Sequence, residues 1–161
     1  MADAPFVPID FAVPQRLVEE AFILEPLGPQ HNDADYAAWS TSTEHIRATP
    51  GFADATWPHS MPIDANLADL ESHARDFEAR SGFTYTVLDP TDDTVIGCVY
   101  IYPARTADAD ASVRSWVRAG SAQLDRPLWH AVAAWLARDW PFARVDYTGR
   151  VEGDARAAAS S

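Results

Sequence analysis

One stretch of the sequence combines a glycine turn with positive charge. Residues 114 to 129 read RSWVRAGSAQLDRPLW, a pattern that predicts a strand, a turn and the first turn of a helix. Free backbone N–H groups converge at a helix N-terminus and attract anions, and glycine lets a phosphate approach the backbone closely. Arg114, Arg118 and Arg126 lie here with only Asp125 opposing them, although the chain has a formal net charge of -12. The turn is therefore a candidate site for a phosphate-bearing ligand, and an ordinary change of chain direction is the alternative.

Two groups of polar side chains have the local spacing of metal ligands. His31 is followed closely by Asp33 and Asp35, and His73 is followed by Asp76. Neither group brings with it the further ligands that a closed metal site needs, and both predicted helices need polar residues at these positions anyway. We therefore expect no metal site. The sequence also lacks a Ser-His-Asp elbow, a Walker loop and a G-x-G-x-x-G pattern.

Hydrophobic spacing predicts a strand, two short helices, a long helix, three antiparallel strands, a helix and a last strand. The long helix, over residues 65–80, and the later one, over 127–139, have apolar residues at helical spacing. The run from Val95 to Tyr102 is apolar without alternation, so it should be a central strand that is covered on both faces. Residues 111–119 alternate, with Val113, Ser115, Val117 and Ala119 on one face and Arg114, Trp116 and Arg118 on the other.

Capping residues predict where the helices begin and end. Thr41 and Glu44 have the spacing of a capping box at the start of a short helix. Asp64 can cap the long helix, and Gly82 can end it. Asp125 can cap the helix that follows the glycine turn.

The first 20 residues are expected to form an extended arm. Prolines interrupt its apolar residues, which disfavours a helix or a sheet strand. Large apolar side chains are costly to leave in water, so Phe6, Ile9 and Phe11 should pack against the domain. Residues 21–150 should form one domain, and the composition VEGDARAAASS predicts a disordered tail over 151–161.

Composition limits the class of protein. With 161 residues and 47% hydrophobic residues, the chain can bury the core of one domain. Its acidic balance disfavours nucleic acid and anionic membranes as partners. The lone Cys98, in an apolar run, is expected to be a small buried hydrophobe. The N-terminus has no basic region before its apolar residues, so we expect neither a signal peptide nor a membrane span, and a cytoplasmic location.

The order of elements from Phe22 to Arg150 resembles the GNAT superfamily of N-acetyltransferases, and the best local matches are VIGCVYIYP and SWVRAGSAQLDRPLW. The resemblance implies an α/β (α+β) fold with a central mixed, mostly antiparallel sheet and helices packed on both faces. In that family, Arg/Gln-x-x-Gly-x-Gly/Ala follows the fourth strand and binds the pyrophosphate of acetyl-CoA. Here the segment reads Arg118-Ala119-Gly120-Ser121-Ala122, with the arginine two residues before the glycine where the family has three.

The resemblance implies transfer of an acetyl or related acyl group from a CoA thioester to an amine of a small molecule. Such a transfer needs donors for the thioester carbonyl, an acid for the thiolate and a base for the amine. Tyr147 on the last strand is the candidate acid, and Glu44 and His45 are the candidate bases; Tyr100 and Tyr102 are candidates to line the substrate pocket. Core packing is the alternative for the tyrosines, and capping is the alternative for Glu44. The residues implied to contact acetyl-CoA are Trp116, Val117, Arg118, Gly120, Ser121 and Ala122.

The chain departs from the family after its last strand. Family members usually continue with another helix and two more strands, whereas this chain continues from Arg150 into a low-complexity segment. Either the site is open, or a second subunit of a homodimer completes it, or acetyl-CoA is not the ligand. The competing hypothesis is therefore a non-catalytic GNAT-like protein that binds a ligand or a partner.

Overall fold

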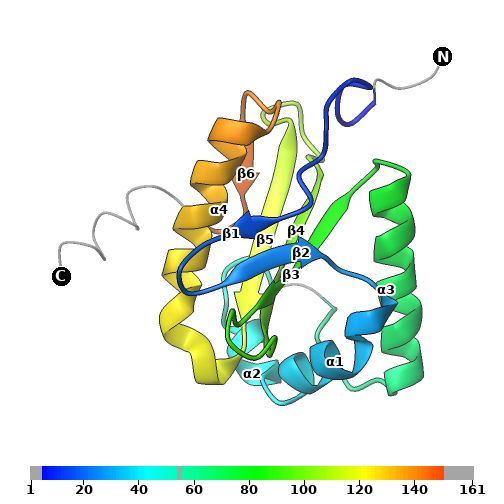
Figure 1. The fold of residues 1–161 in the computed structure, drawn as a ribbon, viewed down its shortest axis with the longest axis vertical. Helices are drawn as coiled ribbons and strands as arrows, with labels where there is room; N and C mark the ends of the chain where they lie inside the picture. Colours follow the sequence, from blue (N-terminus) through cyan, green and yellow to red (C-terminus); the bar gives the residue numbers. More distant parts are fainter. Residues whose placement is uncertain (1–4, 54–55, 151–161) are drawn as a thin grey trace.

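The protein is an α/β fold with one sheet between helices, as Figure 1 shows. The computed structural model describes residues 5–53 and 56–150. The sheet has the order β1-β2-β3-β4-β5-β6, and all neighbouring strands are antiparallel except β5 and β6, which are parallel. The strands are β1 (Leu17–Val18), β2 (Ile23–Pro26), β3 (Phe83–Leu88), β4 (Val95–Pro103), β5 (Ala111–Val117) and β6 (Val145–Tyr147). The helices are α1 (Asn32–Ser40), α2 (Thr43–Arg47), α3 (Ile63–Glu78) and α4 (Asp125–Asp139), with the 3-10 helices η1 (Pro29–His31) and η2 (Ala119–Leu124).

Strand β4 lies inside the sheet, as its apolar run predicts. It pairs with β3 on one side and with β5 on the other. Its residues from Val95 to Val99, together with Ile101, are buried. A strand that is covered on both faces gains no advantage from polar residues at alternate positions, which explains its unbroken apolar sequence. The prediction of a central strand is confirmed.

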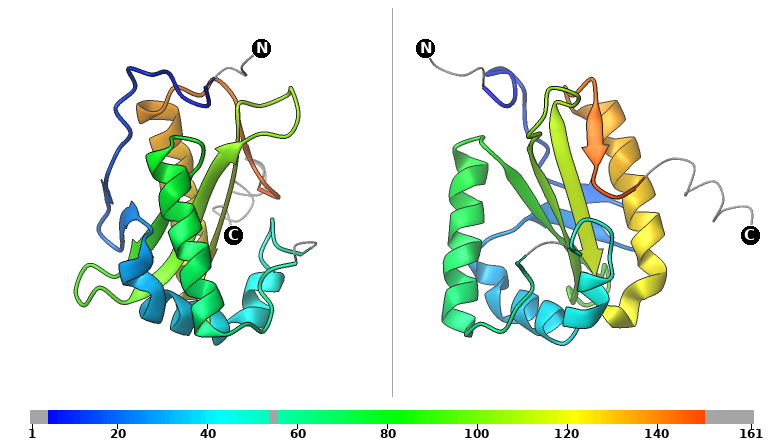
Figure 2. Two further views of the ribbon diagram at one scale, coloured as in Figure 1. Left: turned by 90° about the vertical axis from the view of Figure 1, so that its right-hand side faces the viewer. Right: turned by 180° about the vertical axis from the view of Figure 1, so that it is seen from behind.

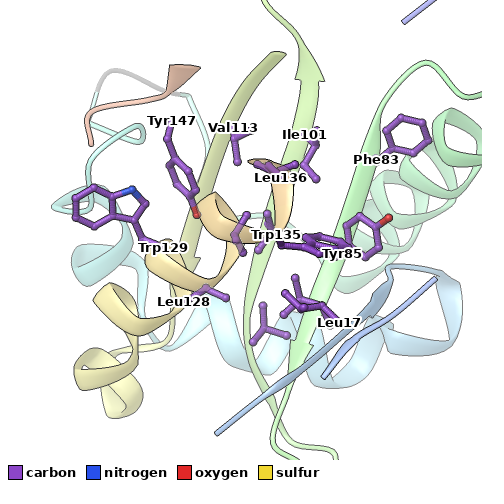
Figure 3. Close-up of a cluster of buried hydrophobic side chains, with 14 of the residues drawn as sticks. Leu17, Phe83, Tyr85, Ile101, Val113, Leu128, Trp129, Trp135, Leu136 and Tyr147 are labelled. Atoms are coloured by element: carbon purple, nitrogen blue, oxygen red, sulfur yellow. The ribbon is translucent and has the colours of Figure 1, made fainter. Parts of the chain in front are cut away.

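Helices cover both faces of the sheet, and this prediction is also confirmed. Figure 1 shows α3 and α4 on opposite sides of the strands. The core on the α4 side includes Tyr85, Val99, Val113, Leu128 and Trp135, several of which appear in Figure 3. The core on the α1–α3 side includes Trp39, Ile46, Phe52, Leu70, Cys98 and Trp116. No helix in the described residues is long and apolar enough to cross a membrane.

The N-terminal arm packs against the α4 side of the sheet, but not through all three predicted residues. The Phe6 ring lies 5.8 Å from that of Phe83, and the Phe11 ring lies 5.4 Å from that of Trp140. The prediction for Ile9 is wrong, because its side chain is 93% exposed, and Val7 is the buried residue of this segment at 1%. The arm also ends in the short strand β1, which the prolines did not lead us to expect. The predicted tail over 151–161 lies outside the described residues.

The start of α2 differs from the predicted capping box. The Thr41 hydroxyl donates to the carbonyl of Ala37 at 2.8 Å, so it faces back into α1. The residue before α2 is Ser42, and its hydroxyl accepts from the N–H of Ala119, 2.9 Å away, instead of capping α2. A contact with a distant segment has taken the place of the local one.

The ends of α3 also differ from the prediction. Pro62 precedes the helix, and Asp64 lies within its first turn. Arg80 adopts the left-handed conformation that follows many helices, with φ of 62°. Gly82 does not end the helix; it leaves room for the ring of Tyr102, from which a Cβ at this position would lie 2.0 Å away.

The exposure difference within the arm gives a matched test of its packing. Val7→Ala should lower the free energy of unfolding by about 1 to 3 kcal/mol, because it removes buried apolar atoms and leaves a cavity. Ile9→Ala should change it by less than about 0.5 kcal/mol, because the isoleucine is already in water. Urea denaturation of both variants measures the difference. Equal losses would contradict the packing described for the arm.

Candidate functional site

The candidate site lies where β6 parts from β5. The two strands pair over Ala111 to Val113 of β5 only, and in the right-hand view of Figure 2 β6 lies beside just part of β5. The N–H of Thr148 donates to the carbonyl of Val113 at 2.7 Å. The chain then turns away, and the N–H of Arg150 donates to the carbonyl of Tyr147 at 2.9 Å. Backbone pairing therefore ends between the last residues of β5 and residues 148–150, and we call this break in the pairing the β5–β6 gap.

Backbone N–H groups of β5 face this gap. The N–H of Arg118 donates to the carbonyl of Ile96 at 2.8 Å, so this N–H points toward β4. In an antiparallel pair this direction alternates, which also turns the N–H of Trp116 toward β4. The N–H groups of Ser115 and Val117 point the other way. Of Trp116, Val117 and Arg118, which the resemblance implies contact acetyl-CoA, only Val117 has its backbone N–H directed into the gap, and the N–H of Ser115 is directed there with it.

Side chains of the protein bridge the gap near its closed end. The hydroxyls of Tyr147 and Ser115 are hydrogen-bonded at 2.5 Å, and both residues are buried. Figure 3 shows the Tyr147 ring on the α4 side, near Trp129. Burial raises the pKa of Tyr147 well above its ordinary value of 10.0, while the Ser115 hydrogen bond and the charge of Arg150 act in the opposite direction. The phenol therefore stays protonated, as an acid must, but its hydroxyl is engaged with Ser115.

An ion pair closes the gap further along. The guanidinium of Arg150 donates to both carboxylate oxygens of Asp125, at 2.6 and 2.8 Å, and lies 5.4 Å from the ring centre of Trp129. The Arg150 side chain is only 8% exposed. Asp125 is the first residue of α4, and Leu124 precedes it as the capping position, so its carboxylate binds Arg150 in place of the predicted cap. We call this pair the Asp125–Arg150 latch.

The glycine turn is a 3-10 helix whose backbone donors are partly engaged. The N–H of Ala119 donates to the hydroxyl of Ser42, and that of Ser121 donates to the carbonyl of Arg118 at 2.9 Å. Gly120 is exposed, and a Cβ at this position would meet no atom within 4 Å. The turn is thus open to solvent at Gly120. It does not form a preformed cradle from all of its N–H groups.

The three arginines of the predicted positive patch do not act together. Arg114 lies on the α1–α3 side, where its guanidinium carbon is 4.7 Å from the ring centre of Phe52 and 5.3 Å from that of Tyr100. Arg118 and Arg126 remain near the turn, and neither side chain has a hydrogen bond or ion pair within the described residues. The local positive charge at the turn is therefore smaller than the sequence indicates.

The fold of this chain resembles that of solved acetyltransferase structures. A ribosomal-protein-S5-alanine acetyltransferase from Vibrio fischeri matches with a TM-score of 0.66 and 12% identity over 90% of this chain and 80% of that chain. A GCN5-related N-acetyltransferase from Brucella melitensis matches with a TM-score of 0.57 and 18% identity over 90% and 65%. RimL, a ribosomal L7/L12 alpha-N-protein acetyltransferase in complex with coenzyme A, matches with a TM-score of 0.58 and 13% identity over 76% of this chain and 67% of that chain. No family model and no curated protein matches the sequence.

The chain has the GNAT fold. The identities are low, so the likeness concerns the fold and leaves the site to be argued from its own residues.

Aromatic and polar side chains line the α1–α3 side of β4 and β5. Tyr100 accepts a hydrogen bond from the indole N–H of Trp116 at 3.0 Å, so it is tied to β5. Tyr102 donates to a carboxylate oxygen of Asp76 at 2.9 Å and lies 2.9 Å from Nδ1 of His73. Both tyrosines lie on this face, and each is held by a polar partner that the sequence did not identify; that they line a substrate pocket stays a prediction. In the described residues no three His, Cys, Asp or Glu side chains gather closely enough to hold a metal ion.

The predicted bases of the GNAT reaction, Glu44 and His45, lie on α2. Glu44 is exposed and His45 is half-buried, and neither side chain forms a hydrogen bond within the described residues. A more unusual acid is Asp35 on α1, for which the sequence indicated no role in proton transfer and which is 4% exposed. Burial raises the pKa of Asp35 from 3.8 to about 6, and a hydrogen bond from Asn66 opposes this shift. The unusually deep burial of an acid in a short helix leaves no local signal in the sequence.

The pKa of Asp35 predicts an unusual pH dependence of stability. Its folded-state pKa is raised, so the stabilising contribution is fully present below about pH 4 and is lost as the pH rises through about 6. Between pH 5 and pH 8 the wild type should lose roughly 1 to 3 kcal/mol of unfolding free energy more than Asp35→Asn does. Denaturation of both proteins at the two pH values measures this difference. Parallel pH profiles would show that Asp35 is not perturbed in this way.

The Asp125–Arg150 latch predicts a local loss of stability. Arg150→Ala leaves the Asp125 carboxylate without its partner and should lower the unfolding free energy by about 1 to 3 kcal/mol. Arg138 and Asp139 form an exposed pair with side-chain exposures of 61% and 40%, so Arg138→Ala should cost less than about 0.5 kcal/mol. Urea denaturation compares the two variants. A similar small effect in both would mean that the latch contributes nothing.

Proposed function

We propose that the protein is an N-acyltransferase that uses acetyl-CoA or a related CoA thioester. The observation that carries this proposal is the β5–β6 gap, into which the N–H groups of Ser115 and Val117 are directed. Two such donors can bind the oxygen of a thioester carbonyl and stabilise the negative charge that develops on it during attack by an amine. The GNAT fold of the solved acetyltransferases supports the proposal.

The acceptor that we propose is a primary amine that approaches from the α1–α3 side. Attack from this side places the amine opposite α4 and near the aromatic residues around Tyr100. Several of the solved neighbours are named as acetyltransferases of ribosomal proteins, one of them as an alpha-N-protein acetyltransferase. A peptide α-amino group is therefore the first acceptor to test, together with small-molecule amines. The formal net charge of -12 favours the approach of a cationic amine.

Acetyl-CoA has to displace contacts of the protein itself in this proposal. The Asp125–Arg150 latch and the Tyr147–Ser115 hydrogen bond occupy the gap. A movement of residues 149–150 can release the Asp125–Arg150 latch while the N–H of Thr148 stays on Val113, whereas the Tyr147–Ser115 hydrogen bond has to be broken by rotation of the Ser115 hydroxyl. Once released, Arg150 supplies a guanidinium beside the N-terminus of α4, which suits a phosphate.

A second candidate function is non-catalytic binding of a ligand or a partner on the same fold. The closed gap favours it, and so does the hydrogen bond that engages the Ala119 N–H with Ser42. In this alternative the contacts that fill the gap are permanent parts of the core. The two candidates differ in whether acetyl-CoA binds at all.

Calorimetric titration with acetyl-CoA tests the proposal. Wild type should bind, and Gly120→Asp should abolish binding, because it places a carboxylate where the phosphates approach the turn. A side chain at Gly120 meets no atom within 4 Å, so this variant should fold normally. Arg118→Ala should weaken binding by roughly 1 to 3 kcal/mol, the range for a charge-assisted hydrogen bond.

The control for these variants is Ala134→Asp, which adds the same charge to an exposed position of α4. It should leave acetyl-CoA affinity unchanged to within about twofold, since screened charges away from the site have little effect. Absence of wild-type binding at millimolar acetyl-CoA would exclude the acyltransferase and leave the non-catalytic function.

A further inference from the structure

His73 is the centre of a polar network between α3 and β4. Its Nδ1 atom lies 2.9 Å from the hydroxyl of Tyr102 and 3.1 Å from that of Thr84. The Tyr102 hydroxyl in turn donates to a carboxylate oxygen of Asp76 at 2.9 Å. Asp76 and His73 are both on α3, whereas Tyr102 and Thr84 come from two neighbouring strands. The imidazole is therefore held from two elements at one of its nitrogens.

The donation from Tyr102 to Asp76 favours a proton on Nδ1 of His73, for which the Thr84 hydroxyl is then a second acceptor. A carboxylate can only accept, so the single proton of the Tyr102 hydroxyl goes to Asp76. The contact between Tyr102 and Nδ1 is then a hydrogen bond only if Nδ1 carries a proton that it donates to the tyrosine oxygen. In the neutral imidazole this leaves a lone pair on Nε2. The Nε2 atom has no hydrogen-bond partner in residues 5–53 and 56–150.

His73 is linked to the end of β5 through one aromatic residue. Its ring centre lies 5.7 Å from that of Tyr100, and the Tyr100 hydroxyl accepts from the indole of Trp116 on β5. The guanidinium of Arg114 lies above the same Tyr100 ring. His73 thus lies on the acceptor side, in the layer of side chains that covers β4 and β5.

The surroundings of His73 keep it neutral. Burial lowers the pKa of His73, and the positive charge of Arg114 on β5 acts in the same direction. The carboxylates of Asp76 and Asp69, on its own helix, oppose this effect. A neutral imidazole with a free Nε2 lone pair can accept a proton at physiological pH.

We propose that His73 is the base that takes the proton from the acceptor amine, and that Asp76 and Tyr102 are positioning residues that hold Nδ1 protonated for this task. The inference rests on the proposed acyl transfer. In the step, the amine nitrogen bonds to the acyl carbon while Nε2 takes one proton from that nitrogen. The carbon–sulfur bond breaks, and its electron pair goes to the sulfur. The thiolate of CoA takes up one proton, and His73 later releases one.

Asp35 is the other buried ionisable group on this side, and its contacts exclude it from this role. Its carboxylate accepts a hydrogen bond from Asn66 at 3.1 Å, between α1 and α3. With an exposed fraction of 4%, it lies behind the surface that an acceptor would touch. Asp35→Asn is therefore a matched control that removes an acid from the same side of the sheet.

The tautomer can be measured without acetyl-CoA or an acceptor. In ¹⁵N NMR spectra of the wild type, the His73 ring should show a protonated Nδ1 and an unprotonated Nε2 at neutral pH. Tyr102→Phe combined with Thr84→Val removes both hydroxyls at Nδ1 and should shift the ring toward the other tautomer, with His31 and His45 unchanged as internal references. A protonated Nε2 in the wild type would overturn the proposal, whatever the protein does with acetyl-CoA.

Kinetics with defined probes tests the catalytic role. The probes are acetyl-CoA and hexapeptides that begin with serine or alanine, and release of the CoA thiol is followed with a thiol-reactive dye. His73→Asn keeps a donor in place of Nδ1 but has no proton acceptor in place of Nε2. It should bind acetyl-CoA as the wild type does, and its turnover should be slower by a factor of about 100 or more. Asp35→Asn should keep wild-type turnover at pH 8.

The pH profile separates positioning from simple structural support. Wild-type kcat/KM should rise with pH and level off as His73 becomes neutral. Asp76→Asn removes a negative charge that raises the pKa of His73, so the acid limb should move to lower pH. Turnover of His73→Asn equal to that of the wild type would overturn the role of His73. Failure of the wild type to bind acetyl-CoA would instead remove the proposed function, and the NMR measurement would still decide the tautomer.

Discussion

The parting of β6 from β5 after Tyr147 is the constraint on which the candidate site depends. A parallel pair that ends after three residues leaves N–H groups of the longer strand without strand partners, and such groups are costly to bury. The chain covers this region with the Tyr147 hydroxyl on Ser115 and the Arg150 guanidinium on Asp125. The separation of the two strands therefore leaves N–H groups of β5 unpaired, and it also requires side-chain contacts that shield these groups.

In the proposed function, the Asp125–Arg150 latch and a phosphate-bearing ligand compete for the same charged groups at the start of α4. Asp125 is the first residue of α4, where the helix dipole favours a negative charge, and Arg150 balances it. A polyanion at this helix end has to compete with the Asp125 carboxylate for the dipole and for Arg150. In the proposed function, the affinity for a CoA thioester is the difference between these two sets of contacts. In that proposal, the latch sets how tightly a CoA thioester binds.

Features that repeat along the chain could be predicted from the sequence, and single contacts between distant segments could not. The apolar run of β4 and the helical spacing in α3 and α4 each involve many residues, so one exception does not alter the result. A cap rests on one residue: Thr41 has the right type and spacing, yet its hydroxyl donates to Ala37. Asp125 and Arg150 are 25 residues apart, and no periodicity indicates that they meet. The fold was therefore more predictable than the polar contacts of the site.

The two sides of the sheet differ in the kind of group they bury. The α4 side is apolar apart from the Tyr147–Ser115 hydrogen bond and the Asp125–Arg150 latch, whereas the α1–α3 side encloses Asp35 and the network around His73. Burying such groups costs free energy that apolar residues would not, and each needs several partners to hold it. Glu44 and His45, the bases predicted from the sequence, need no such support because water reaches them. Ionisable groups that a fold keeps inside at a cost are better candidates for proton transfer, which is why the proposed base is His73, between α3 and β4, and not a residue of α2.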